Sequence, residues 1–155
     1  LMMPFIDDRN ALKKRLIAAY DAVKKLPQVD ASNINIIGFC FGGLCALDLA
    51  RSGIDIKKAV SFHGLLFPPS QSECVKIKAK ILVLHGYDDP MCQPIQLGTF
   101  AKEMTEKKVD WQLHAYGNTQ HAFTNPQAND NTLGLKYNER SEKRAWQSMI
   151  TFLNE

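Results

Sequence analysis

The residues from 33 to 50 constrain the fold of this chain more than any other stretch. They begin with a short apolar run, pass through Gly38-Phe39-Cys40-Phe41-Gly42, and continue with leucines at helical spacing among small residues. The apolar run predicts a strand over about 33–38, and the leucines predict a helix over about 41–51 with Gly53 at its C-terminal cap. The glycines at the turn lack a Cβ, so the strand and the helix can approach each other closely there. A strand, a very tight turn and a helix therefore meet at the central cysteine.

The turn around Cys40 has the pattern of a nucleophile elbow, which is Gly-x-Ser-x-Gly in most α/β-hydrolases. The apex residue of such a turn has a strained backbone, and its side chain stands clear of the sheet. The N-terminus of the following helix directs free N–H groups at the apex, which favours negative charge and lowers the pKa of a thiol there. A free cysteine is usually an inert buried thiol, but not at the apex of a Gly-x-Cys-x-Gly-Gly turn. We therefore predict that Cys40 is a nucleophile.

Apolar runs and amphipathic segments alternate along the rest of the chain. The predicted elements are a helix from Asp7 or Asp8 to about Leu26, strands over 58–63, 80–85 and 110–116, a helix from Pro94 through Met104, loops over 65–72 and 117–135, and a final helix that includes 145–153. The alternating pattern of 110–116 places that strand nearer an edge. Apolar strands between amphipathic helices predict a mostly parallel sheet flanked by helices on both faces, a three-layer α/β sandwich. We expect residues 1–155 to form a single domain.

Composition excludes several classes of function. The net charge is +3, and the lysines are scattered rather than gathered in a basic stripe, so we expect no nucleic-acid partner. No apolar run approaches the roughly 20 residues of a membrane helix, and the first residues do not resemble a signal peptide. The four cysteines show no CxxC motif and no Cys/His ligand spacing. We therefore expect reduced thiols in a cytoplasmic protein rather than a disulfide framework or a zinc site.

Chemically useful residues stand at the carboxyl ends of the predicted strands, where function collects in parallel sheets. Those ends carry Cys40, then His63, then Asp88-Asp89, and finally Gln120-His121. A nucleophile, an acid and a histidine in this order match the order of the triad in α/β-hydrolases. His121 would accept the thiol proton, and Asp89 would hold the histidine in the correct tautomer. Asp88 is the alternative acid, and we expect His63, like His85, to close its strand by packing and backbone hydrogen bonds.

Four motifs together resemble those of the dienelactone hydrolase family. They are Gly38-Phe-Cys-Phe-Gly-Gly43, Ser61-Phe-His-Gly64, His85-Gly-Tyr-Asp-Asp-Pro90 and His121-Ala-Phe-Thr-Asn-Pro126, and the resemblance covers nearly the whole chain. It implies an α/β-hydrolase fold with a Cys40-His121-Asp89 triad. It also implies hydrolysis of small-molecule esters or lactones through a thiol acyl-enzyme, without metal or organic cofactor.

The resemblance also implies an oxyanion hole and an acyl pocket. The backbone N–H of Phe41, the residue after the nucleophile, is the expected first oxyanion donor, and the second would come from a loop upstream of this chain. Phe39 and Phe123 flank catalytic positions and are candidate substrate-binding residues, although core packing is an equal alternative. Trp111 and Trp146 are predicted to lie in the core rather than to form substrate platforms.

Family members carry strands before the first helix of this chain, so the sequence resembles the C-terminal two-thirds of an N-terminally truncated family fold. The elbow strand would then form an exposed edge, which predicts a homo-oligomer or swapped assembly. One alternative function is a catalytically incomplete fragment that serves as a binding or assembly module. A thioesterase or acyltransferase with the same triad is another alternative and ranks lowest among the enzymes, because the sequence shows no acceptor site such as a basic patch for phosphopantetheine.

Overall fold

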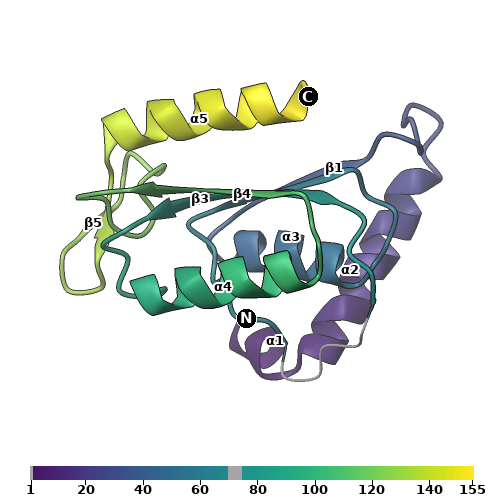
Figure 1. Ribbon diagram of the computed structural model, residues 1–155, viewed down its shortest axis with the longest axis horizontal. Helices are drawn as coiled ribbons and strands as arrows, with labels where there is room; N and C mark the ends of the chain where they lie inside the picture. Colours follow the sequence, from purple (N-terminus) through teal and green to yellow (C-terminus); the bar gives the residue numbers. More distant parts are fainter. Residues whose placement is uncertain (1, 70–74) are drawn as a thin grey trace.

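The computed structural model describes residues 2–69 and 75–155. Its main sheet has four strands in the order β1 (Asn35–Phe39), β2 (Lys58–Phe62), β3 (Lys80–Gly86) and β4 (Trp111–Tyr116), and every neighbouring pair is parallel (Figure 1). The strand order follows the chain order, and because every pair is parallel, all the carboxyl ends lie at one end of the sheet. β4 is an edge strand, as the alternating pattern predicted.

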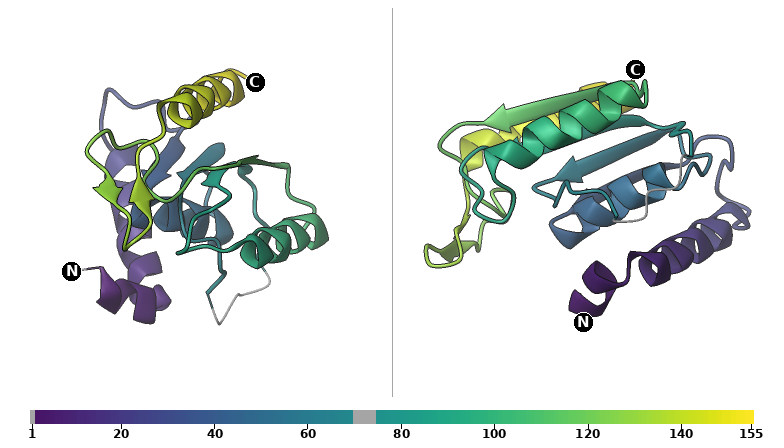
Figure 2. Two further views of the ribbon diagram at one scale, coloured as in Figure 1. Left: turned by 90° about the vertical axis from the view of Figure 1, so that its left-hand side faces the viewer. Right: turned by 60° about the horizontal axis from the view of Figure 1, so that its bottom comes forward.

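Helices cover both faces of this sheet, which confirms the three-layer α/β architecture. The helices are α1 (Met3–Asp7), α2 (Arg9–Lys24), α3 (Phe41–Arg51), α4 (Pro94–Glu106) and α5 (Glu139–Leu153). α5 lies on one face, and α3 and α4 lie on the other, with α2 packed against α3 (Figure 2). Among the described residues no helix has both the length and the apolar character to cross a membrane.

The central strands are buried on both faces, and their side chains alternate between two cores. Ile81 and Val83 of β3 face α3 and α4, and pack in a cluster that includes Leu47 and Phe100. The intervening residues of β3 face α5, where the buried cluster comprises Val60, Phe62, Leu82, Leu84, Phe123, Ala145, Met149 and Phe152. The period of two in β-strands thus explains why a continuous apolar sequence serves two cores.

Several local features differ from the prediction. The sequence did not predict the short helix α1. The helix that follows it, α2, is capped by Asp8 as predicted, through a hydrogen bond accepted from the Ala11 amide at 2.9 Å. The predicted loop over 117–135 contains part of a small antiparallel hairpin, β5 (Asn129–Asp130) and β6 (Leu135–Lys136). Strands of two residues are too short to show a periodic pattern. Of the loop predicted over 65–72, residues 65–69 have no regular structure and 70–72 lie outside the described residues.

The two tryptophans have different environments. Trp111 packs against the α4 core, and its ring lies edge-on to Phe100 at 6.0 Å, as predicted. The prediction for Trp146 is wrong, since the side chain is 40% exposed and lies 6.2 Å from the ring of Phe39. The reason is that α5 packs over β2 and β3, which leaves this side of the helix uncovered next to the β1 edge.

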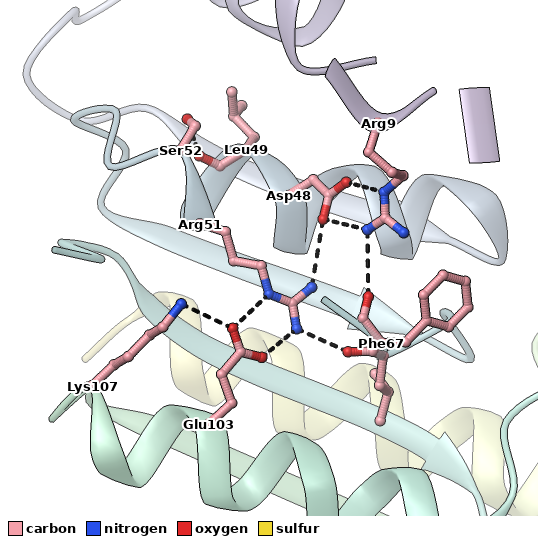
Figure 3. Close-up of polar contacts among 9 residues, drawn as sticks. Arg9, Asp48, Leu49, Arg51, Ser52, Phe67, Glu103 and Lys107 are labelled. Carbon is pink, nitrogen blue, oxygen red and sulfur yellow. Dashed lines mark hydrogen bonds and ion pairs between the residues drawn. The ribbon is translucent and has the colours of Figure 1, made fainter. Parts of the chain in front are cut away.

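A buried network of charges ties α2, α3 and α4 together (Figure 3). Asp48 accepts hydrogen bonds from Nε and Nη2 of Arg9, both at 2.6 Å, and lies 3.5 Å from Nη1 of Arg51. Arg51 makes a bidentate pair with Glu103 at 3.1 and 2.7 Å and donates to the Leu66 carbonyl at 2.8 Å. The network therefore also holds the segment that follows β2.

Replacing Asp48 with alanine tests this network. The Arg9 and Arg51 side chains, which are 9% and 4% exposed, would lose the carboxylate between them. Because breaking a buried pair leaves uncompensated charge, we expect the free energy of unfolding to fall by about 3–5 kcal/mol in urea titrations followed by circular dichroism. Glu139→Ala is the control, since it removes an exposed pair with Lys143 and should leave stability nearly unchanged. Equal losses in the two variants would contradict this account.

Candidate active site

Cys40 forms a one-residue turn between β1 and α3. Its φ of 53° and ψ of −118° are strained for a residue with a Cβ, and its carbonyl accepts from the Gly43 amide at 2.9 Å. A Cβ built on Gly38 would lie 1.9 Å from the Gly42 carbonyl oxygen, so only glycine fits there. The structure thus places Cys40 at the apex of a tight strand–turn–helix junction, as its sequence pattern indicates.

Asp89 and His121 meet beside this turn, each from the carboxyl end of a different strand. His121 Nδ1 lies 2.7 Å from Asp89 Oδ2, and the two side chains are 2% and 0% exposed. Asp89 Oδ1 accepts from the Met91 amide at 2.8 Å, which fixes the carboxylate. Since an ionised carboxylate only accepts, Nδ1–H of His121 donates to it, and Nε2 is the nitrogen left to react.

The environment of Nε2 of His121 differs from that of Nδ1. Nε2 has no hydrogen bond of standard geometry to any described residue, although it is buried. The His121 side chain is nevertheless the largest influence on the pKa of Cys40, which lies below its ordinary value. A contact that is loose in the free protein and tightens with bound substrate is common between a nucleophile and its base.

The pKa values of Cys40 and His121 are shifted in opposite directions. Interaction with His121 lowers the pKa of Cys40 despite burial, and the Phe41 backbone N–H contributes in the same direction. Burial alone would lower the pKa of His121, but hydrogen bonds to Asp89 and Cys40 and the charges of both outweigh it and raise that pKa to about 9. Between the two pKa values the pair is a thiolate beside an imidazolium, which is the reactive form of a cysteine nucleophile.

The other described thiols lack this environment. Burial raises the pKa of both Cys45 and Cys92 to about 11. No disulfide joins the described cysteines Cys40, Cys45 and Cys92, and Cys74 lies outside the described residues. Within the described ranges no group of three His, Cys, Asp or Glu residues is arranged to hold a metal ion.

The remaining candidate residues separate into accessible and buried ones. Phe41 is half-buried at the first position of α3, with its amide directed at the thiol. Phe39 is 39% exposed beside Cys40, whereas Phe123 has no exposed surface and packs in the α5 core. The sequence left core packing of Phe123 open, and the structure places it there. Asp88 is exposed, and Asp89 is the carboxylate that meets His121.

His63 and Thr124 join the site in a way that the sequence did not predict. The His63 ring lies 3.2 Å from the Cys40 amide through Nδ1 and 2.9 Å from the Thr124 hydroxyl through Nε2. The hydrogen bond to backbone was expected, but not that its partner is the Cys40 amide. His85 bonds the Cys92 carbonyl at 2.9 Å, as its prediction stated. Both extra residues lie inside two of the family-like motifs, which was the available signal.

Comparison with known proteins agrees with this fold. The sequence model of the dienelactone hydrolase family matches residues 1–155. An uncharacterized protein of Caenorhabditis elegans is 37% identical over 155 residues, which are 96% of this chain and 96% of that protein. A Bradyrhizobium protein named "Probable 2-oxo-3-(5-oxofuran-2-ylidene)propanoate lactonase" is 32% identical over 127 residues, covering 76% of this chain and 50% of its own.

Solved structures give the same result. The crystal structure of a dienelactone hydrolase-like promiscuous phosphotriesterase from metagenomic libraries superposes with a TM-score of 0.92 at 38% identity. The match covers 98% of this chain and 64% of that one. The chain therefore spans less than two-thirds of this structure and half of the Bradyrhizobium relative, but nearly all of the nematode protein.

Gly38→Ala tests the close approach at the elbow. The added methyl group meets the Gly42 backbone, so β1 and α3 must separate, and we expect a loss of about 1–3 kcal/mol or more in the free energy of unfolding. Gly42→Ala is the control, because a Cβ there meets nothing within 4 Å. Denaturant unfolding measures both, and an equally stable Gly38 variant would disprove the close packing.

The pH dependence of Cys40 alkylation by iodoacetamide tests the thiolate–imidazolium pair. With peptide mapping by mass spectrometry, we expect an inflection below the ordinary thiol value of 9.0, and an upward shift of that inflection in His121→Ala because the largest stabilising influence is lost. His114→Ala is the control, since His114 bonds Ser148 at 3.1 Å. Identical profiles for His121→Ala and the unmodified protein would exclude the pair.

Proposed function

This chain belongs to the dienelactone hydrolase family, and we propose that it hydrolyses small carboxylic esters or lactones with Cys40 as nucleophile, His121 as base and Asp89 as its orienting acid. The observation that carries the proposal is the buried 2.7 Å contact between His121 and Asp89 beside a Cys40 of lowered pKa. The other acid and histidine of the same motif lack such a contact: Asp88 is exposed, and His85 bonds the Cys92 carbonyl.

Acylation begins with attack of the Cys40 sulfur on the carbonyl carbon of the substrate. The carbonyl oxygen becomes an oxyanion, and the Phe41 amide at the N-terminus of α3 is the donor best placed to stabilise it. The oxyanion then collapses and breaks the bond to the leaving oxygen, which takes the Nε2 proton of His121. The product alcohol leaves, or stays tethered in the case of a lactone, and the acyl group remains on the sulfur as a thioester.

Deacylation repeats these steps with water. Neutral His121 takes a proton from water through Nε2, and the resulting hydroxide equivalent attacks the thioester carbonyl. Breaking the C–S bond releases the carboxylic acid and restores the thiolate. Asp89 keeps Nδ1 protonated throughout, so that Nε2 is the nitrogen that cycles between acceptor and donor.

The accessible face of Phe39 supports its assignment as a substrate contact. The ring is exposed beside the apex, stacks on Phe62 at 4.6 Å and lies near Trp146. The exposed rings of Phe39 and Trp146 form an apolar surface beside the elbow, over the buried Phe62, and this surface suits a small apolar acyl or alkoxy group. Phe123 has no surface left for substrate, so its part in the proposal is limited to packing behind the site.

A second chain is proposed as a partner at the outer edge of β1. This edge pairs with no other described strand, and Ile37 beside it is 42% exposed. Unpaired backbone groups at a sheet edge favour pairing with another strand, which could also supply a second oxyanion donor. Loss of one such donor typically lowers turnover by about 10²–10³-fold. The unpaired thiols support a reducing compartment, with the cytoplasm as our expectation.

Turnover of p-nitrophenyl acetate and of a small unsaturated lactone tests the function, with the oligomeric state measured in the same preparation. We expect Cys40→Ala to abolish turnover and Asp89→Asn to lower kcat by about 10²–10⁴-fold through loss of the correct tautomer. Asp88→Asn is the matched control and should retain activity. An acyl adduct on Cys40 in intact mass spectra would support the mechanism.

Equal turnover by the unmodified protein and Cys40→Ala would contradict the assignment. Absence of turnover in both proteins would favour the alternative of a binding or assembly module, since the chain matches about half of the curated lactonase relative.

A further inference from the structure

His63 occupies a strained position beside the nucleophile. β1 pairs with β2 so that Phe39 lies opposite Phe62, and Cys40 and His63 therefore leave the sheet side by side. The backbone φ of His63 is 39°, in the region that favours glycine, and its side chain is buried with only 3% of the residue exposed. Strain of this kind persists where surrounding contacts over-determine it, and it is concentrated at functional sites.

The hydrogen bonds of His63 define the state of its ring. Nδ1 faces the Cys40 amide, which can only donate, at 3.2 Å, and shares this donor with the Phe62 carbonyl at 3.0 Å. Nδ1 is therefore an acceptor and carries no proton. The proton of the neutral ring must then lie on Nε2, which donates to the Thr124 hydroxyl at 2.9 Å. Burial, and next the charge of His121, lower the pKa of His63 to about 3, so the ring stays neutral at working pH.

The same ring supports the loop that carries His121. It meets the His121 ring nearly edge-on, with centroids 5.0 Å apart, and the Phe123 ring at 5.3 Å. Ala122, between those two, has a φ of 56°, so the loop turns sharply before it reaches Thr124. His63 thus contacts the elbow backbone through one nitrogen, the His121 loop through the other, and the His121 ring through its face or edge.

We propose that His63 and Thr124 are positioning residues that set the His121 ring against the Cys40 thiol. The proposal rests on the proposed function in taking Cys40 and His121 as the reacting pair. The elbow and the His121 loop follow different strands, and the His63 bridge fixes the distance between them through two directional bonds. Without it, His121 keeps its bond to Asp89 but is free to turn about that bond, away from the sulfur.

Thr124→Val and Thr124→Ser form the decisive pair of variants. Valine keeps the shape of threonine and removes the hydroxyl, whereas serine keeps the hydroxyl. The readout is the pH profile of Cys40 alkylation. The charges that act on the Cys40 thiol are those of His121 and Asp89. The charges that act on the His63 ring are those of His121, Asp89 and His85. We expect valine to raise the apparent pKa of the thiol by about half a unit to one unit, as expected for loss of one hydrogen bond, and serine to match the unmodified protein.

His63→Phe and His63→Gln separate positioning from packing. Phenylalanine fills the ring volume without either hydrogen bond, so a wild-type profile in that variant would overturn the proposal, as would a wild-type profile in Thr124→Val. Glutamine can still donate to Thr124, and we expect it to shift the profile less than phenylalanine does. If the His63 variants fail to fold in circular dichroism, the Thr124 pair decides.

Ester turnover provides a second readout. Thr124→Val should lower kcat by about 3–10-fold with KM unchanged, since the alignment of reacting groups changes and not the binding surface. Alkylation needs no turnover, so it tests His63 and Thr124 even in a chain that hydrolyses no ester. Failure of the proposed function and failure of this proposal therefore give different results.

Discussion

The contact between β1 and α3 at Gly38 and Gly42 is the constraint on which the site depends. Because the two backbones touch, the chain has a single residue in which to turn, and that residue is Cys40 with its φ of 53°. The turn exposes the thiol at the carboxyl end of the sheet and aims the first free amide of α3 at it. The parallel register then brings His63, Asp89 and His121 to the same end.

Burial acts in the same direction on the three described thiols, and a partner of opposite charge decides the outcome. For Cys45 and Cys92 it raises the thiol pKa to about 11 and leaves them unreactive. At Cys40 the same desolvation is overcome by a neighbouring histidine that is itself held by Asp89. The difference lies in pairing, since a buried charge is stable only beside an opposite one. The Arg9, Asp48, Arg51 and Glu103 network follows the same rule, and it supports the segment after β2 rather than the chemistry.

Much of the fold could be predicted because its signals are local. The apolar strands, the amphipathic helices and the Gly-x-Cys-x-Gly-Gly turn each lie within a few consecutive residues, where strand and helix periods are readable. The short hairpin over Asn129–Lys136 and the exposure of Trp146 were not predictable in this way. The hairpin is too short for a period, and the exposure of Trp146 depends on which strands α5 covers.

The sequence by itself determined the α/β class, the tight turn at Cys40 and the order of cysteine, aspartate and histidine at the strand ends, because each depends on residue type and spacing along the chain. Only the tertiary structure decided that Asp89 rather than Asp88 meets His121, that Phe123 packs in the core, and that His63 bridges Cys40 to Thr124. These are contacts between residues that lie far apart in the sequence. They depend on strand register and on which side of a turn each side chain leaves, and no local pattern encodes either.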